Sequence, residues 1–113
     1  MIAKDLLVND IVALRTSDIG EEVLSMMHLY HVRHLPIVND KQLLGLISES
    51  DIVMNDMKES IGSYGLSLFK PYCFEKDHIF DVMGQVARFN LTLIPVIDEK
   101  SQFLGVITLE KLL

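Results

Sequence analysis

The sequence has no tryptophan, one cysteine and three prolines among its 113 residues. A single cysteine, Cys73, cannot form a disulfide within the chain, which favours a reducing compartment. No apolar run approaches the roughly 18 residues of a membrane-spanning helix. Lys4 and Asp5 interrupt the only apolar stretch at the N-terminus, so no signal peptide is predicted. We therefore expect a cytoplasmic chain without membrane insertion.

Positive charge is also scarce, because 10 Lys and Arg residues stand against 16 Asp and Glu residues, for a net charge of −6. This balance disfavours nucleic acid as a partner and broad attachment to an anionic membrane, but it permits one nucleotide held by a few donors. No nucleophile–base pair, acid pair or glycine-rich phosphate loop stands out. We therefore expect no enzyme and no required cofactor.

The clearest positive feature is an internal repeat. Residues 35–41 (LPIVNDK) return 59 residues later as 94–100 (IPVIDEK). Residues 44–48 (LGLIS) return 60 residues later as LGVIT, and one insertion near Ser101 explains the change. Each copy is too small to bury its own apolar face, so the two copies should pack together in one domain with clefts between them.

The first copy alternates strands and helices. After a helical turn within 2–8, the short β-branched run 11–14 predicts a buried strand. Residues 16–18 (TSD) resemble a helix start. Residues 35–38 and 43–47 predict an antiparallel hairpin, and the capping-box pattern of 48–51 predicts a second helix. The first helix should bury Val23, Met26, Met27 and Tyr30.

The second copy repeats this order. Residues 71–74 predict its first strand, 94–97 and 103–107 predict its hairpin, and Thr108 precedes a last short helix. Its first helix should present an apolar face to the core, made of Phe80, Met83, Val86 and Ala87. The glycine- and serine-containing connector 58–70 is too apolar for a free linker, so it should cover an edge of the core or a partner surface.

These motifs resemble the cystathionine-β-synthase (CBS) domain, and two in tandem resemble a CBS pair, or Bateman module. The resemblance implies an α/β (α+β) fold of two βαββα repeats packed about a pseudo-twofold axis. It places the first repeat at 1–57, the connector at 58–70 and the second repeat at 71–113. It also implies a non-catalytic regulatory module that forms a homodimer, binds an adenine nucleotide and signals to an effector protein or domain.

The nucleotide signature of the family is intact in residues 45–51 (GLISESD). A carboxylate accepts both hydroxyl hydrogens of a ribose diol, and a serine beside free backbone N–H groups suits ribose or phosphate. By resemblance, Asp51 holds ribose and Ser48 lies near ribose or phosphate, with Gly45 opening the strand surface. AMP, ADP, ATP and other adenosyl compounds are the candidate ligands. A capping box formed by Ser48 and Asp51 is the alternative, since it explains both residues without a ligand.

Arg33 and His34 stand where the family often directs basic residues to phosphates, although a single arginine is also common on plain surface. The apolar residues expected around adenine are Ile11, Val12, Ala13, Pro36 and Ile37.

The second copy departs from the signature, because Lys111 replaces the aspartate and has no acceptor for ribose hydroxyls. Thr108, Lys111 and Pro95 mark this second candidate cleft, and we expect at most one well-formed nucleotide site per chain.

Two alternatives complete the interpretation. The spacing of His28, His31 and His34 invites a metal site, but no cysteine or carboxylate completes a ligand set, so no metal is predicted. A module that dimerises or docks a partner without any small ligand is the second candidate function.

Overall fold

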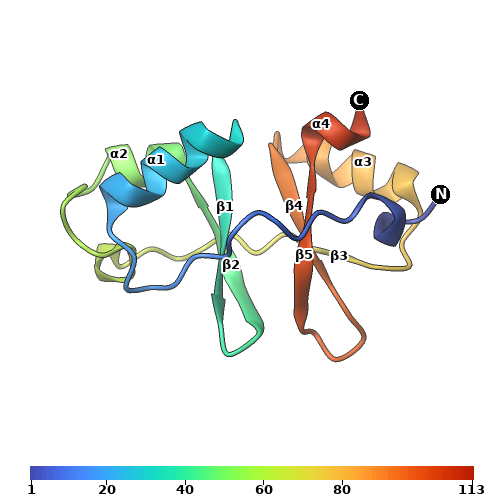
Figure 1. Ribbon diagram of the computed structural model, residues 1–113, viewed down its shortest axis with the longest axis horizontal. Coiled ribbons are helices and arrows are strands. Elements are labelled where there is room, and N and C mark those ends of the chain that lie inside the picture. Colours follow the sequence, from blue (N-terminus) through green and yellow to red (C-terminus); the bar gives the residue numbers. More distant parts are fainter.

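The computed structural model describes residues 1–113 and shows two similar halves side by side (Figure 1). The first half contains α1 (Gly20–Tyr30), β1 (His34–Asn39), β2 (Gln42–Ser48) and α2 (Glu49–Val53). The second contains β3 (Cys73–Phe74), α3 (Ile79–Arg88), β4 (Leu93–Ile97), β5 (Phe103–Thr108) and α4 (Leu109–Leu112). Short 3-10 turns, η1 (Ala3–Leu6) and η2 (Ile61–Tyr64), lie outside these units.

Both predicted hairpins are present. β1 pairs with β2, and β4 pairs with β5, each antiparallel and each with one register shift. β3 adds a parallel strand beside β4. The helices of each half lie toward the same side of the molecule, and both hairpin turns point the opposite way (Figure 1). The predicted mixed fold of two similar repeats is confirmed.

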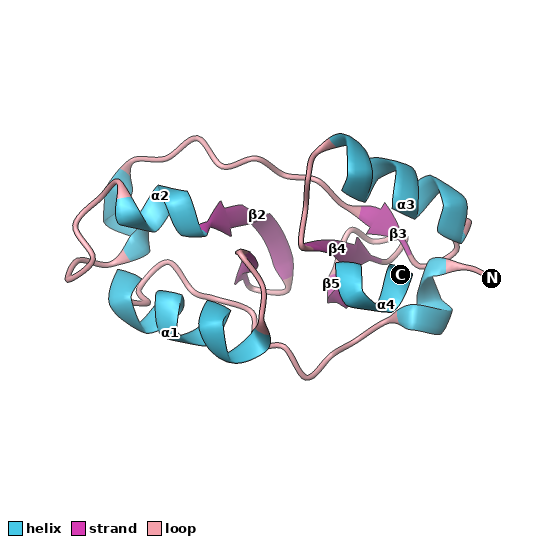
Figure 2. Ribbon diagram, turned by 90° about the horizontal axis from the view of Figure 1, so that it is seen from above, coloured by secondary structure: helices cyan, strands magenta, loops and turns pink.

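The chain crosses twice between the halves, on opposite sides of the molecule (Figure 2). Val8 pairs with β5 through two hydrogen bonds to Val106, with N–O distances of 2.8 and 2.9 Å. In the other direction, the backbone N–H of Leu46 in β2 donates to the carbonyl of Phe69 at 2.8 Å. The segment before α1 thus pairs with β5 of the second half, and the connector that leads to the second half pairs with β2 of the first half.

Two glycines permit these crossings. A Cβ on Gly45 would lie 2.7 Å from Cβ of Leu68, and one on Gly105 would lie 2.6 Å from the carbonyl oxygen of Val8. Their φ angles of 153° and 157° are also ones that other residues rarely adopt. Gly45 therefore lets the connector approach β2 closely, and Gly105 lets the segment around Val8 approach β5 closely.

The predicted strand at 11–14 is wrong. Only Leu14 pairs with β1, through hydrogen bonds to Pro36 and Val38, and it is the one fully buried residue of that run. The residues before it belong to the crossing segment, and Val12 is 55% exposed. The predicted strand at 71–74 is also shorter, and only Cys73–Phe74 pair with β4.

The start of α1 differs from the prediction at 16–18. The N-cap is Ile19, without a side-chain cap, while the backbone N–H groups of Gly20 and Glu21 donate to carbonyls of Glu59 and Met57. Asp18 instead closes a turn by accepting from the backbone N–H of Arg15 at 2.8 Å. Backbone carbonyls at the junction of the first repeat and the connector thus supply the partners that a capping side chain would otherwise provide.

The buried face of α1 is as predicted, with Val23 and Met27 buried and Met26 and Tyr30 packed against the core. The face predicted for α3 is largely wrong, because Phe80 is 72% exposed while Val82 is fully buried. Met83 and Ala87 are also exposed, and Val86 is the one member that is buried. The helix therefore directs its two valines, four residues apart, into the core.

One continuous apolar core joins the two halves, and residues of α1, β1, β4 and β5 all contribute to it. The connector covers part of this core, since Ile61 is buried and Leu66 and Leu68 pack against it. Cys73 is buried in the same core. No helix of the chain is long and apolar enough to cross a membrane.

Candidate functional site

A cleft opens where the first repeat meets the second. One cavity of about 260 Å³ is lined by His34, Ser48 and Asp51 of the first repeat and by Phe89 and Leu91 of the second. A second, more polar cavity of about 440 Å³ shares some of these residues and adds the four polar residues Arg33, Glu49, Ser50 and Asn90. The structure therefore brings four of the predicted site residues to one cleft: Arg33 before β1, His34 of β1, Ser48 of β2 and Asp51 of α2.

Ser48 and Asp51 form a reciprocal capping box at the start of α2. The Asp51 Oδ2 atom accepts from the backbone N–H of Ser48 at 2.9 Å, and the Ser48 Oγ atom accepts from the backbone N–H of Asp51 at 3.1 Å. The Oδ1 atom of Asp51 has no hydrogen-bond partner within the chain. The cap thus holds the carboxylate rigidly and leaves one of its oxygens free to accept from a ligand.

His34 joins the first repeat to the second. Its Nδ1 atom lies 2.8 Å from Thr92 Oγ1 and accepts from the backbone N–H of Thr92 at 3.3 Å. Burial, reinforced by the nearby positive charge of Arg33, lowers the pKa of His34 below its ordinary value, while Asp51 opposes that shift. His34 is therefore a neutral group at pH 7.

The apolar wall of the cleft comes from residues that the sequence did not single out for a site. Phe69 of the connector meets Phe89 edge-on, with ring centroids 4.9 Å apart, and the guanidinium of Arg88 lies 5.1 Å from the Phe89 centroid. Four leucines complete this wall, namely Leu46, Leu66, Leu68 and Leu91. In the sequence, the high number of apolar residues in the connector is the one indication of this wall.

The residues predicted around adenine do not line either cavity of this cleft. Pro36 and Ile37 are buried in the hairpin, whereas Val12 is exposed and Ala13 half-buried on the crossing segment. Gly45 lies behind the wall, where Leu68 and Phe69 cover it.

The equivalent cleft of the second repeat is smaller, at about 230 Å³, and Thr92, Thr108, His31 and Glu110 supply its polar lining. Lys111 is exposed and does not line this cavity, although its backbone N–H caps on Thr108 at 3.4 Å. Pro95 is buried in β4. No carboxylate occupies the position equivalent to Asp51, so the two clefts differ in chemistry.

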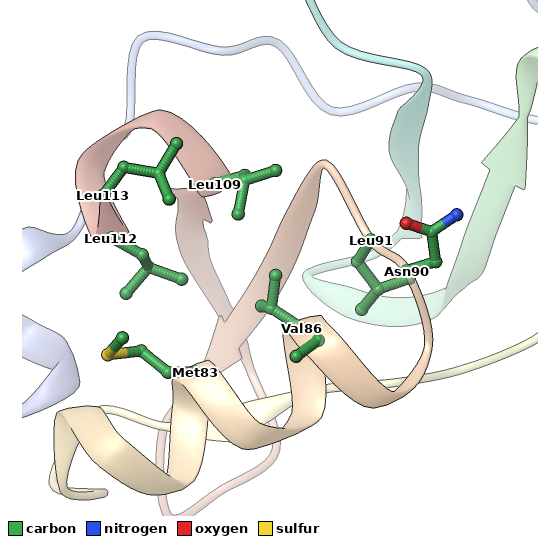
Figure 3. A pocket seen from close by; sticks show the side chains of 8 residues that line it. Met83, Val86, Asn90, Leu91, Leu109, Leu112 and Leu113 are labelled. Atoms are coloured by element: carbon green, nitrogen blue, oxygen red, sulfur yellow. The ribbon is translucent and has the colours of Figure 1, made fainter.

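A third hollow, of about 210 Å³, lies between α3 and α4 and is almost entirely apolar. Figure 3 shows Met83 and Val86 of α3 facing Leu109, Leu112 and Leu113 at the end of the chain. Its residues offer no charge to a ligand.

A family model of the CBS domain matches residues 3–58 and 70–113. The fold is similar to a CBS domain pair/ACT domain protein from Thermotoga maritima, with a TM-score of 0.85 and 20% identity over 99% of this chain and 93% of that one. It is also similar to CBSX2 in complex with AMP, with a TM-score of 0.81 and 16% identity over 98% and 92% of the two chains.

A third similar structure is the CBS domain pair of protein MJ0100 in complex with 5′-methylthioadenosine and S-adenosyl-L-methionine. Its TM-score is 0.79, with 22% identity over 98% of this chain and 91% of that one. These likenesses show the fold. With the family match over both repeats, they establish that the chain belongs to the CBS domain family and is a CBS domain pair.

Proposed function

We propose that this CBS pair is a non-catalytic regulatory module that binds an adenine nucleotide in the cleft of its first repeat. The observation that carries the proposal is the Asp51 carboxylate, which its cap holds at the cleft with Oδ1 unpaired. The ligands of CBSX2 and protein MJ0100 support an adenosyl compound, since both structures contain one.

Each part of a nucleotide has a chemical counterpart in the cleft. Asp51 accepts hydrogen bonds from the ribose hydroxyls, and Ser48 lies beside it. The wall around Phe69 and Phe89 suits the flat, apolar faces of adenine. Arg33 lines the adjoining polar cavity and offers a guanidinium to a phosphate. A ligand in this position touches both repeats and so favours one relative packing of them over another.

Thermal unfolding with AMP, ADP, ATP and S-adenosylmethionine tests this proposal. A ligand at about 100 times its dissociation constant stabilises the fold by roughly 2.7 kcal/mol. Asp51→Asn is the informative variant, because the amide oxygen can still accept from the backbone N–H of Ser48, whereas an NH2 donor replaces the free oxygen and the negative charge is removed. Lys111→Ala is the matched control in the other repeat. Equal loss of the ligand effect in both variants would contradict a single site.

A ligand-free interaction module is the second candidate, and the apolar hollow between α3 and α4 favours it. Phe80 and Leu113 are strongly exposed near this surface. In this alternative the surface contacts a second copy or an effector protein in the cytoplasm. Sedimentation of the chain, and of Met83→Lys, would then show a dimer that dissociates in the variant, while none of the four nucleotides would change the melting temperature.

A further inference from the structure

The link between His34 and Thr92 is directional. A backbone N–H can only donate, so the contact from the Thr92 N–H requires a lone pair on Nδ1 of His34. Because Nδ1 is then an acceptor, the Thr92 hydroxyl is the donor in its 2.8 Å contact with the ring, while Oγ1 accepts from the backbone N–H of Arg33 at 3.0 Å. In the neutral ring the proton therefore resides on Nε2.

The His34 ring also lines the candidate ligand cleft. His34 lines both of its cavities, and Nε2 makes no hydrogen bond within the chain. A ring locked in this tautomer thus offers a donor, not an acceptor, to whatever enters. The donor complements the acceptor of Asp51 in the same cavity.

We propose that Thr92 is a positioning residue for the first-repeat cleft: it fixes the tautomer of His34 across the boundary between the repeats and makes that boundary sensitive to protonation. Adding a proton to His34 places an N–H of the ring against the Thr92 N–H and hydroxyl. The two N–H groups then repel, and the Thr92 hydroxyl loses its acceptor on the ring, so the contact between His34 and Thr92 is weakened.

Charges of both signs surround His34. Arg33, immediately before β1, disfavours protonation, whereas Asp51 on α2 favours it, and Glu49 of α2 lines the adjoining cavity. The second repeat contributes uncharged groups at Asn90, Leu91 and Thr92, and Arg88, which lines neither cavity, lies against the Phe89 ring. The cavity-lining connector residues 66–69 carry no titratable side chain. Burial is thus the leading cause that keeps the ring neutral.

Nitrogen-15 NMR of the imidazole rings tests the tautomer lock on the whole, ligand-free chain. At pH 7.5 we expect His34 in the Nε2–H form, with a titration midpoint below the ordinary value of about 6.5. Thr92→Val leaves only the backbone N–H of residue 92 to donate to Nδ1, so it should raise the share of the Nδ1–H form and move the midpoint up, whereas Thr92→Ser, which keeps the hydroxyl, should behave as the wild type. An Nδ1–H ring in the wild type overturns the proposal, whether or not the valine variant folds. If the tautomer and the titration midpoint of His34 are unchanged in a folded Thr92→Val variant, the proposed role of the Thr92 hydroxyl is overturned as well.

A consequence for ligand binding rests on the proposed function. Adenosine is the probe, because it has no phosphate whose own titration would confuse the result. If only the neutral ring binds, the affinity for adenosine falls about tenfold for each pH unit below the His34 midpoint. Constant affinity across that range would overturn the coupling. If adenosine does not bind at any pH, the proposed nucleotide-binding function is contradicted. The nitrogen-15 NMR experiment would still show whether Thr92 fixes the tautomer of His34.

Discussion

Arg33 and Thr92 hold equivalent positions in the two repeats, 59 residues apart, and they touch, because the backbone N–H of Arg33 donates to Thr92 Oγ1 at 3.0 Å. The same hydroxyl contacts His34 at 2.8 Å. The divergence of the repeats at this position, from arginine to threonine, thus supplies a polar contact between them. The two copies are joined here by residues in which they differ.

Removing the Thr92 hydroxyl should loosen the contact between the repeats. Thr92→Val keeps the shape of the side chain but removes both hydrogen bonds of the hydroxyl, so the free energy of unfolding should fall by about 1 kcal/mol. Urea unfolding measures the change, with Thr92→Ser as the control expected to stay near the wild type. A valine variant as stable as the wild type would show that these hydrogen bonds make no net contribution to the free energy of unfolding.

Stability should fall on the acid side of neutrality through His34. Its pKa in the folded chain is lowered, by burial first and by Arg33 second, so the unfolded chain binds the proton more readily. This contribution is complete above the unfolded pKa of about 6.5 and is lost as the pH falls through the lower pKa of the folded chain. Urea unfolding of the wild type and His34→Gln between about pH 5 and pH 8 should show a smaller dependence on pH in the variant. His31→Gln, at an exposed histidine, is the control, and an identical slope in all three proteins would contradict the assignment.

The two motif glycines should resist substitution for a conformational and a steric reason. Gly45→Ala and Gly105→Ala each place a Cβ within 3 Å of a crossing segment at positive φ, and each should cost about 1–3 kcal/mol. Gly84 is the matched control, since it lies within α3 with open space around its Cβ position. Gly84→Ala should stabilise the chain by roughly 0.5–1 kcal/mol. Thermal melting of the three variants would refute this account if Gly45→Ala melted at or above the wild type.

Cys73 should be unreactive in the folded chain. Burial, with a smaller effect of Asp77, raises the pKa of its thiol to about 12, so almost no thiolate exists at pH 8. A disulfide reagent such as DTNB should therefore label Cys73 only after unfolding in guanidinium chloride. Prompt labelling without denaturant would show that the thiol is accessible in the native chain.

Much of the fold was predictable because the repeat is carried by local patterns. Alternating aliphatic residues around Pro36 and Pro95 indicated the two hairpins, and the spacing of Ser48 and Asp51 indicated the capping box that the structure contains. Such signals act over a few residues and need no knowledge of distant contacts.

The cleft wall was not predictable in the same way. Phe69 and Phe89 come together only because the connector crosses to β2 while α3 ends beside it, and no local pattern encodes that crossing. For the same reason the run before Leu14 resembled a strand although it passes between the repeats. On α3, the exposed Phe80 shows that an apolar residue in a helix does not by itself identify the buried face.

The central claim is that the first-repeat cleft, and not its counterpart, holds an adenine nucleotide. Isothermal titration of AMP, ADP, ATP and S-adenosylmethionine into the wild type, Asp51→Asn and Lys111→Ala tests it most directly. We expect at least one of these ligands to bind one per chain, with affinity reduced about tenfold or more in Asp51→Asn, a loss of roughly 1.4 kcal/mol, and unchanged in Lys111→Ala. Binding of none of the four, or equal affinity in the wild type and Asp51→Asn, would contradict the account.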